Sequence, residues 1–361
     1  MITSVIAVLG IAGAVTAGAA TAPGALADRP PPADTGRAST DTGPADLPAG
    51  LSGGIYLFHY APLAMEEARA RTEVYALFVD LDRAWNGFGL HIQARARDTR
   101  LRPYYPGTVW FQEAYGYYDS PAGRLMAGKL YERIGRFWDG SFFGNVQYFD
   151  GLKLDPDFGL ALEGERGLGP RWSAEYSAQY FTASDGINGA LDGRDVESAA
   201  DRRERDTWVA RIAPRLHLGS DLSVAVGVSY QNGRIERPAG SDRRRAVALD
   251  AELRGGPGIG YAEYTVVRGA NAPAPPQLAG AVADEVRYWL AGARTHVGPL
   301  ELRYNYSRAD YRGTGHVDAI HQPGVTLRIT AGLAALLELD YWESGGDVFD
   351  RSLNAVLLAT F

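Results

Sequence analysis

The chain has 361 residues, of which 46% are hydrophobic and 22% charged, and it contains no cysteine. The missing cysteine excludes a disulfide framework, a cysteine-ligated metal site and thiol catalysis. The formal net charge of −7 argues against a nucleic-acid partner, and a mean hydropathy of −0.19 argues against a bundle of membrane-spanning helices.

The first 27 residues have the pattern of an export signal. Residues 5–22 are almost all Val, Ile, Leu, Ala and Gly, and an Ala-Leu-Ala sequence ends at residue 27, just before the charged Asp28. An apolar stretch followed by such a site is typical of a cleaved signal peptide, although no Lys or Arg precedes the stretch here. An uncleaved anchor helix is the alternative, which the shortness of the run disfavours. We expect residues 1–27 to be removed on export.

Two further parts follow the signal. Residues 28–50 are rich in Pro and small polar residues, and we expect a periplasmic linker there because this composition cannot bury a core. From 51 to 361, hydrophobic residues recur at every second position, which is the period of a strand with one apolar face. In one such segment the apolar residues are Leu222, Val224, Val226, Val228 and Tyr230. Residues 51–361 are therefore expected to form one β domain.

The alternating segments predict sixteen strands with a regular rhythm of connections. Their ranges are 54–60, 72–83, 86–98, 107–118, 123–133, 157–165, 170–181, 206–217, 221–231, 243–254, 258–268, 284–295, 299–309, 321–330, 334–343 and 351–361. Most are about 9–12 residues long, which suits a tilted membrane-spanning strand better than a globular one. Every second connection is predicted to be short and the others longer. This rhythm predicts an all-β, 16-stranded antiparallel transmembrane β-barrel with short periplasmic turns and long extracellular loops.

Aromatic residues support the membrane interpretation. Trp172 and Tyr180 lie on the apolar face of one predicted strand, near its two ends, and Trp208 and Leu216 mark the same span on the next strand. That span corresponds to roughly 20 Å of height, close to the apolar band of a membrane barrel, whose edges carry aromatic girdles. The alternative is that these are ordinary core aromatics of a soluble sandwich.

Two segments resemble known outer-membrane barrels. The last strand ends on Phe361 and resembles the C-terminal strand by which the barrel-assembly machinery of Gram-negative bacteria recognises its substrates. The segment 107–164 contains an aromatic strand, AGKLY at 127–131 and FWDGSFFG at 137–144, and it resembles the phosphate-selective O/P-type porins and their DcaP-like relatives. This resemblance implies a sixteen-stranded homotrimer in the outer membrane, in contact with lipid and lipopolysaccharide.

Phosphate selectivity does not carry over from these porins. They hold a lysine cluster for phosphate, whereas this chain has only Lys129 and Lys153 among its 36 basic residues. A sixteen-stranded barrel leaves room for a water-filled channel, and charged side chains lining such a channel set its selectivity. We therefore expect a passive diffusion channel for small polar or anionic solutes, with a weak anion preference from arginines in the lumen.

The pore-lining and constriction candidates come from the inward faces and from the connection 134–156. They are Arg95, Arg97, Arg136, Asp139, Lys153, Asp155, Glu163, Glu175, Arg211, Arg215, Asp250, Arg303 and Arg328. In porins of this type the corresponding third loop folds into the barrel and narrows it, and its aromatics would pack it against the wall. Two alternatives stay open: the loop remains outside as a cap, or the charges pair with each other and only keep the lumen wet.

Other functions are conceivable for this pattern. The six histidines are scattered, without the paired spacing of a metal site, so no enzyme activity, cofactor or metal is expected. A barrel enzyme with a Ser/His site, a plugged adhesin or structural barrel, and a soluble secreted β-sandwich binding protein are the alternatives. Conductance in a bilayer separates the channel from all three.

Overall fold

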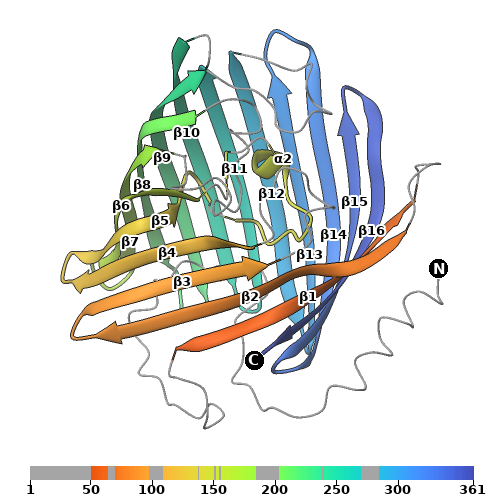
Figure 1. The fold of residues 1–361 in the computed structure, drawn as a ribbon, viewed down its shortest axis with the longest axis horizontal. Coiled ribbons are helices and arrows are strands. Elements are labelled where there is room, and N and C mark those ends of the chain that lie inside the picture. The colour runs from red at the N-terminus through yellow and green to blue at the C-terminus, as the bar shows by residue number, and fades with distance from the viewer. Residues whose placement is uncertain are drawn as a thin grey trace.

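The computed structural model describes residues 50–63, 70–96, 109–136, 138–149, 152–153, 156–183, 203–237, 240–269 and 284–361. These residues form sixteen antiparallel strands that close into one barrel (Figure 1). The strands are β1 (Leu51–Pro62), β2 (Arg71–Trp85), β3 (Phe88–Ala96), β4 (Val109–Ser120), β5 (Gly123–Tyr131), β6 (Pro156–Gly167), β7 (Trp172–Ala183), β8 (Arg203–His217), β9 (Leu222–Arg237), β10 (Gly240–Gly255), β11 (Gly258–Gly269), β12 (Glu285–Val297), β13 (Leu300–Tyr311), β14 (His316–Thr330), β15 (Leu333–Ser344) and β16 (Asp347–Thr360). The predicted fold class is confirmed.

The two ends of the barrel differ in their connections. One end, here called the turn rim, carries the short turns 86–87, 121–122, 168–171, 218–221, 256–257, 298–299 and 331–332. The first and last strands meet there, where Gly53 and Phe361 exchange backbone hydrogen bonds of 3.2 and 3.0 Å. The opposite end, here called the loop rim, carries the connections that follow odd-numbered strands.

Three of the connections at the loop rim differ from the prediction. The connections after β9, β13 and β15 span only residues 238–239, 312–315 and 345–346, so the prediction of longer loops at these places was wrong. The strands instead continue past their apolar portions as polar extensions, because backbone pairing does not require an apolar face. The connections 63–70, 97–108, 132–155, 184–202 and 270–284 are the longer ones.

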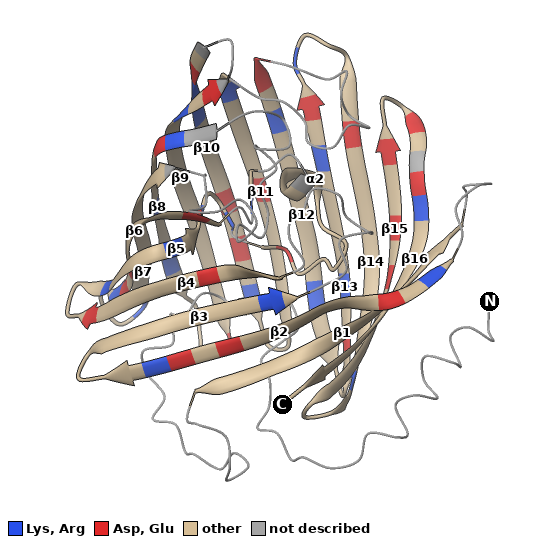
Figure 2. Ribbon diagram, viewed as in Figure 1, with Lys and Arg blue, Asp and Glu red and all other residues tan. Residues whose placement is uncertain are grey.

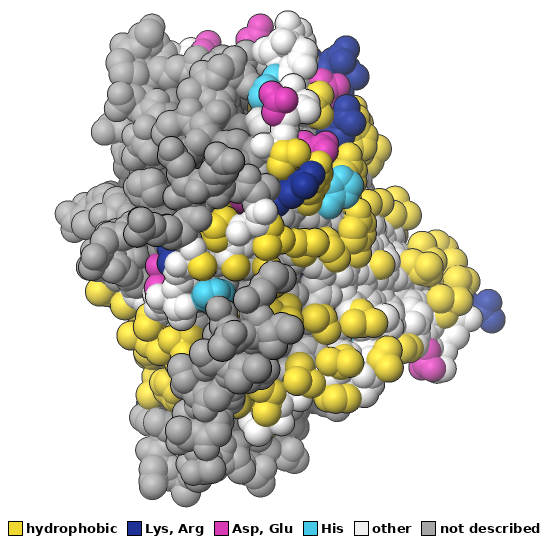
Figure 3. All heavy atoms as spheres, turned by 90° about the vertical axis from the view of Figure 1, so that its right-hand side faces the viewer, with side chains coloured by type: hydrophobic (Ala, Val, Ile, Leu, Met, Phe, Trp, Pro, Cys, Tyr) yellow, Lys and Arg dark blue, Asp and Glu magenta, His cyan; other side chains and the backbone are white. Residues whose placement is uncertain are grey.

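The apolar faces of the strands point out of the barrel. On β9, Val226 and Val228 are 55% and 44% exposed, whereas Ser229 and Gln231 on the opposite face are 1% and 0% exposed. Figure 3 shows hydrophobic side chains across the middle of the described surface on one side, with most of the visible charged ones near its upper end. A soluble sandwich would bury the apolar face. This inverted arrangement therefore contradicts the soluble-sandwich alternative.

The predicted aromatic pairs lie in register on the outer surface. Trp172 is paired with Leu216 and Tyr180 with Trp208, and the rings of Tyr180 and Trp208 are 4.4 Å apart. Trp172 and Trp208 are 48% and 58% exposed, so they are not core aromatics. They mark the two edges of an outward apolar band, which is where amphipathic rings lie in membrane barrels.

This outward band gives a first prediction. Leu249 lies on β10, pairs with Val228 and Tyr264, and is 53% exposed. On a lipid-facing surface, Leu249→Arg should lower the free energy of unfolding by about 2–4 kcal/mol, because a charge at mid-bilayer is poorly solvated. Reversible urea unfolding in phospholipid vesicles measures this difference. An unchanged unfolding midpoint would contradict a lipid-facing band.

Candidate functional site

The inner wall carries many of the charged residues of the strands. Figure 2 shows basic and acidic positions distributed along many strands of the barrel. The register brings several of them together: Arg211 donates two hydrogen bonds to Asp250, of 2.7 and 2.8 Å, and Arg215 lies 2.8 Å from Glu175 and 3.1 Å from Glu252. Four of the predicted lumen residues therefore form ion pairs, which favours the interpretation that these charges compensate one another.

A segment between β5 and β6 lies inside the ring of strands. This crossing segment comprises the described residues 132–136, 138–149 and 152–153, and it includes the helix α2 (Val146–Phe149). Figure 1 shows α2 within the outline of the barrel, and it contacts β13 and β14. Its first turn is capped by Asn145, whose Oδ1 accepts a 2.9 Å hydrogen bond from the Tyr148 backbone. Nowhere in the described ranges is a helix long and apolar enough to cross a membrane.

The first anchor of the crossing segment is Glu263, on the inner face of β11. Its carboxylate accepts hydrogen bonds from Lys153 Nζ at 2.7 Å, from the Arg136 backbone at 2.6 Å and from Gln147 Nε2 at 2.8 Å. The side chains of Lys153 and Glu263 are 1% and 0% exposed. A buried carboxylate is stable only when its lone pairs are satisfied in this way. Lys153 is thus a structural partner of the wall in this conformation.

Arg136 and Gly135 extend this anchor. The Arg136 guanidinium forms an ion pair with Glu252 on β10 and lies 4.1 Å above the ring of Tyr261. Gly135 has φ +61°, and a Cβ at this position would lie 2.4 Å from Glu263 Oε2. Only glycine permits both this backbone conformation and this close approach.

The second anchor is Glu338, on the inner face of β15. It accepts hydrogen bonds from the backbone N–H groups of Phe142 (3.0 Å) and Phe143 (2.7 Å) and from Arg303 Nη2 (2.8 Å). Arg303 also donates a 2.7 Å hydrogen bond to the carbonyl of Gly140. Arg303 and Glu338 are 2% and 0% exposed. The two carboxylates thus hold the crossing segment from separate parts of the wall.

Asp139 stabilises the segment from within. Its carboxylate accepts hydrogen bonds from the Ser141 backbone (2.9 Å), the Ser141 hydroxyl (2.7 Å) and Asn145 Nδ2 (2.9 Å). It is 2% exposed, so in this conformation it shapes the chain between the two anchors and does not contact the solvent of the lumen.

Aromatic packing adds to these polar contacts. The Phe142 ring lies 5.4 Å from Phe58 and 5.2 Å from Tyr75, and Phe143 lies 6.4 Å from Trp342. The segment also joins a buried apolar cluster whose members come from β4 to β15; its contributions to that cluster are Ile134, Val146, Tyr148 and Leu152. The sequence predicted that the loop aromatics pack against the wall, and Phe142 and Phe143 lie beside wall aromatics in this conformation.

The remaining predicted site residues have different environments. Glu163 pairs with Arg133, and Arg95 donates hydrogen bonds of 3.0 and 2.7 Å to Gln93. Arg97 and Asp155 lie outside the described residues.

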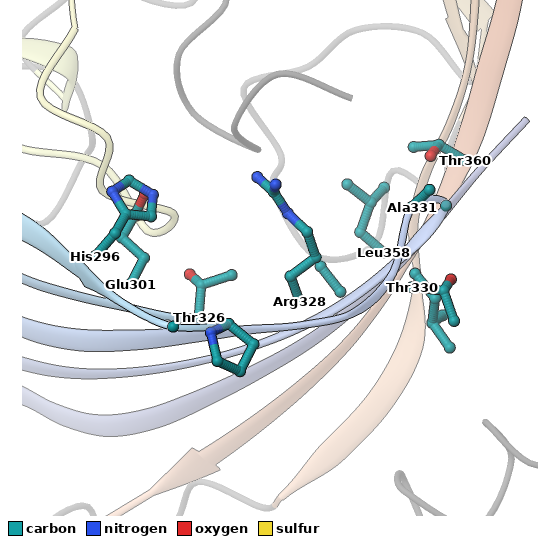
Figure 4. A pocket seen from close by; sticks show the side chains of 13 residues that line it. His296, Glu301, Thr326, Arg328, Thr330, Ala331, Leu358 and Thr360 are labelled. Carbon is teal, nitrogen blue, oxygen red and sulfur yellow. The ribbon is translucent and has the colours of Figure 1, made fainter. Parts of the chain in front are cut away.

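Arg328 differs from the paired arginines. It is exposed, and it has no ion-pair partner among the described residues. Figure 4 shows its guanidinium pointing away from the strands into a pocket near the turn rim, between Glu301 and Leu358. The same pocket contains His296, whose Nε2 lies 3.1 Å from Glu301. Arg328 is thus a candidate for a cation that a passing solute would meet.

Sequence reasoning missed two residues of this site. Glu263 holds three groups of the crossing segment, and Arg133 is the partner of Glu163. The alternation through Ile259 and Tyr261 places Glu263 on the inner face, so this signal was present in the sequence. The partners of Glu263 were not predictable, because they depend on the path of the segment through the barrel. Within the described ranges, no group of three or more His, Asp or Glu side chains is arranged to hold a metal ion.

Comparison with known proteins relates the fold to outer-membrane channels. No family model and no curated sequence matches the chain. The chain is similar in structure to the outer membrane channel DcaP of Acinetobacter baumannii, with a TM-score of 0.58 and 10% identity over 86% of this chain and 96% of that one. OmpF of Salmonella typhi, in complex with daunomycin, gives 0.58 and 12%, over 86% and 97% of the two chains. The anion-selective porin of Comamonas acidovorans gives 0.56 and 9%, over 86% and 98%. At these identities the similarity shows a porin-like fold.

The first anchor gives a second prediction. Glu263→Ala would leave the buried Lys153 ammonium without its carboxylate, which should lower the free energy of unfolding by about 3–5 kcal/mol. Glu165→Ala on β6 is the matched control, because Glu165 is exposed and its loss should change the free energy by less than about 0.5 kcal/mol. Urea unfolding of both variants measures the difference. Equal stability of the two variants would show that the anchor contributes nothing.

Proposed function

We propose that the chain is an outer-membrane porin that lets small hydrophilic solutes diffuse passively. The observation that carries this proposal is the inverted barrel: an apolar outer band on a closed sheet whose interior is lined by charged and polar groups. Such a sheet can span a membrane because no strand edge is left unpaired. The fold shared with DcaP and OmpF supports the same conclusion.

The crossing segment is the proposed constriction. It is held to two separate parts of the wall, β11 through Glu263 and β15 through Glu338, so it would narrow the cross-section of the lumen from within. Two arginines of the segment remain partly exposed, Arg133 (12%) beside Glu163 and Arg136 (13%) beside Glu252 on the wall. A solute would therefore pass beside ion pairs whose charges largely cancel, which favours weak selectivity.

The proposed selectivity is a weak preference for anions. Most inner-wall arginines described above have a carboxylate neighbour, whereas Arg328 has none within the described residues and projects into the turn-rim pocket. An uncompensated guanidinium attracts carboxylate and phosphate groups and repels cations. Arg95 on β3 and Arg97, which follows that strand in the sequence, remain proposed contributors to this selectivity. The proposed solutes are small polar or anionic molecules.

The remaining parts of the proposal concern export and assembly. We propose that residues 1–27 are a signal peptide and that 28–50 form a periplasmic linker before the barrel. The final strand, with Phe361 at its end, would engage the barrel-assembly machinery. The resemblance to O/P-type porins supports a homotrimer embedded in outer-membrane lipid and lipopolysaccharide.

A plugged structural barrel is a second candidate that one observation favours. The crossing segment is fixed by two buried ion pairs and by an apolar cluster that includes residues from β4 to β15. Such packing could close the lumen to solutes.

Conductance distinguishes the two candidates and tests for a channel. The purified full chain in a planar phospholipid bilayer should give discrete conductance steps, and Glu338→Ala should give larger steps because the tip of the crossing segment loses its anchor. Steps that appear only in Glu338→Ala would indicate a plugged barrel. A protein that inserts but never conducts, in either form, would refute the porin.

Arg328 gives a prediction about selectivity. In a salt gradient near 0.1 M, where the Debye length is about 10 Å, the wild-type reversal potential should favour anions slightly. Arg328→Ala should move the reversal potential toward cations. Arg83→Ala is the control, because Arg83 is exposed on β2 near the same turn rim but is not among the residues that line the pocket. If Arg328→Ala and Arg83→Ala have the same reversal potential as wild type, Arg328 does not set selectivity.

A further inference from the structure

A row of arginines on the outer surface lies in register across four strands at the loop rim. Arg205 on β8 is opposite Arg234 on β9, which is opposite Arg243 on β10. One step closer to the apolar band, Arg245 on β10 is opposite Arg268 on β11. This arginine row (Arg205, Arg234, Arg243, Arg245 and Arg268) therefore places like charges directly beside one another, which destabilises a sheet unless an anion compensates them.

Carboxylates of the barrel compensate only part of the arginine row. Arg205 lies 2.8 Å from Glu236, Arg268 lies 2.7 Å from Glu285, and Arg234 lies 3.6 Å from Asp206. Arg243 and Arg245 are exposed, and neither has an ion-pair partner among the described residues. The centre of the row thus carries uncompensated positive charge on a surface that faces away from the lumen.

The position of the row identifies the environment that it meets. On β10 the outward residues that follow Arg245 toward the turn rim are Val247 and Leu249, which are 45% and 53% exposed. Trp208 on β8 and Tyr230 on β9 are 58% and 47% exposed, and they lie at the edge of the apolar band that is nearer the loop rim. The arginines therefore begin where the apolar band and its aromatic edge end, which is the level of lipid headgroups at a membrane surface.

We propose that the arginine row is a binding surface for phosphate-bearing headgroups of the lipid that surrounds the barrel at its loop rim. Planar guanidinium groups bind phosphate through paired hydrogen bonds, and two or more arginines on neighbouring strands can share one phosphate group. Acyl chains of the same lipid would lie against Val247 and Leu249 below. The inference rests on the proposed membrane location of the barrel and adds a lipid class to it.

The test compares lipids that differ only in phosphate. The full-length protein is transferred to micelles of an alkyl maltoside detergent, which carries no phosphate, and titrated with a diphosphorylated diglucosamine glycolipid or with the same glycolipid lacking both phosphates. Bound lipid is measured by native mass spectrometry. The variant is Arg234→Gln with Arg243→Gln and Arg245→Gln. The control is Arg83→Gln with Arg166→Gln and Arg171→Gln, which removes the same charge from exposed arginines near the turn rim.

The phosphorylated glycolipid should bind wild type and control equally, and the loop-rim variant about a hundredfold more weakly, since each arginine contributes about 1 kcal/mol near a charged headgroup. Equal binding of both glycolipids, or an equal loss in the control, would overturn the proposal. So would competition by inorganic phosphate at the same concentration as the glycolipid, because it would show a site for free anions.

Two further measurements distinguish a failure of the lipid-binding proposal from a failure of the proposed channel function. The loop-rim variant should conduct like wild type in a planar bilayer, because its substitutions are outside the lumen; a barrel that never conducts would refute the channel, not the lipid site. If the triple variant fails to fold, Arg243→Gln and Arg245→Gln are tested singly, because each removes an exposed side chain without an ion-pair partner among the described residues. Wild-type affinity in both would overturn the proposal.

Discussion

The hydrogen bonds between β1 and β16 determine the rest of this architecture. They run from Gly54 opposite Thr360 to Pro62 opposite Ser352, and they convert a sixteen-stranded sheet into a barrel without an edge. In hydrocarbon, each unpaired backbone group costs several kcal/mol, so only a closed sheet can place β-strands there. Once the sheet is closed, each strand has one face toward the surroundings and one toward the interior, and the side-chain period of two separates apolar from polar residues.

The interior then requires compensation for the charges that it receives. Arg303 with Glu338 and Lys153 with Glu263 are nearly inaccessible pairs, and each carboxylate also accepts hydrogen bonds from the backbone of the crossing segment. These pairs couple the path of the segment to the wall, since each carboxylate would lose most of its hydrogen-bond donors without it. The proposed constriction and the stability of the barrel therefore depend on the same contacts.

The strands could be predicted from the sequence because one periodic signal runs through all of them. The three loops that were wrongly predicted, after β9, β13 and β15, lie where the alternation of apolar residues stops. The backbone pairing between the strands continues beyond that point. Asn232-Gly233 has the composition of a turn, yet both residues pair within β9 with Arg245 and Arg244. The inward arginines and acids were predictable from alternation, whereas their partners were not. Arg136 and Glu252 meet only because the crossing segment turns into the barrel, which no local pattern in the strands encodes.

The orientation of the strand faces is tested most directly by cysteine scanning, because the chain has no cysteine of its own. Single cysteines at Ala225, Val226, Gly227, Val228 and Ser229 on β9, each labelled with a small fluorophore, are placed in bilayers that contain brominated lipids. We predict strong quenching at positions 226 and 228 and little quenching at 225, 227 and 229. Quenching at the odd-numbered positions, or equal weak quenching at all five, would contradict a membrane barrel with an apolar exterior.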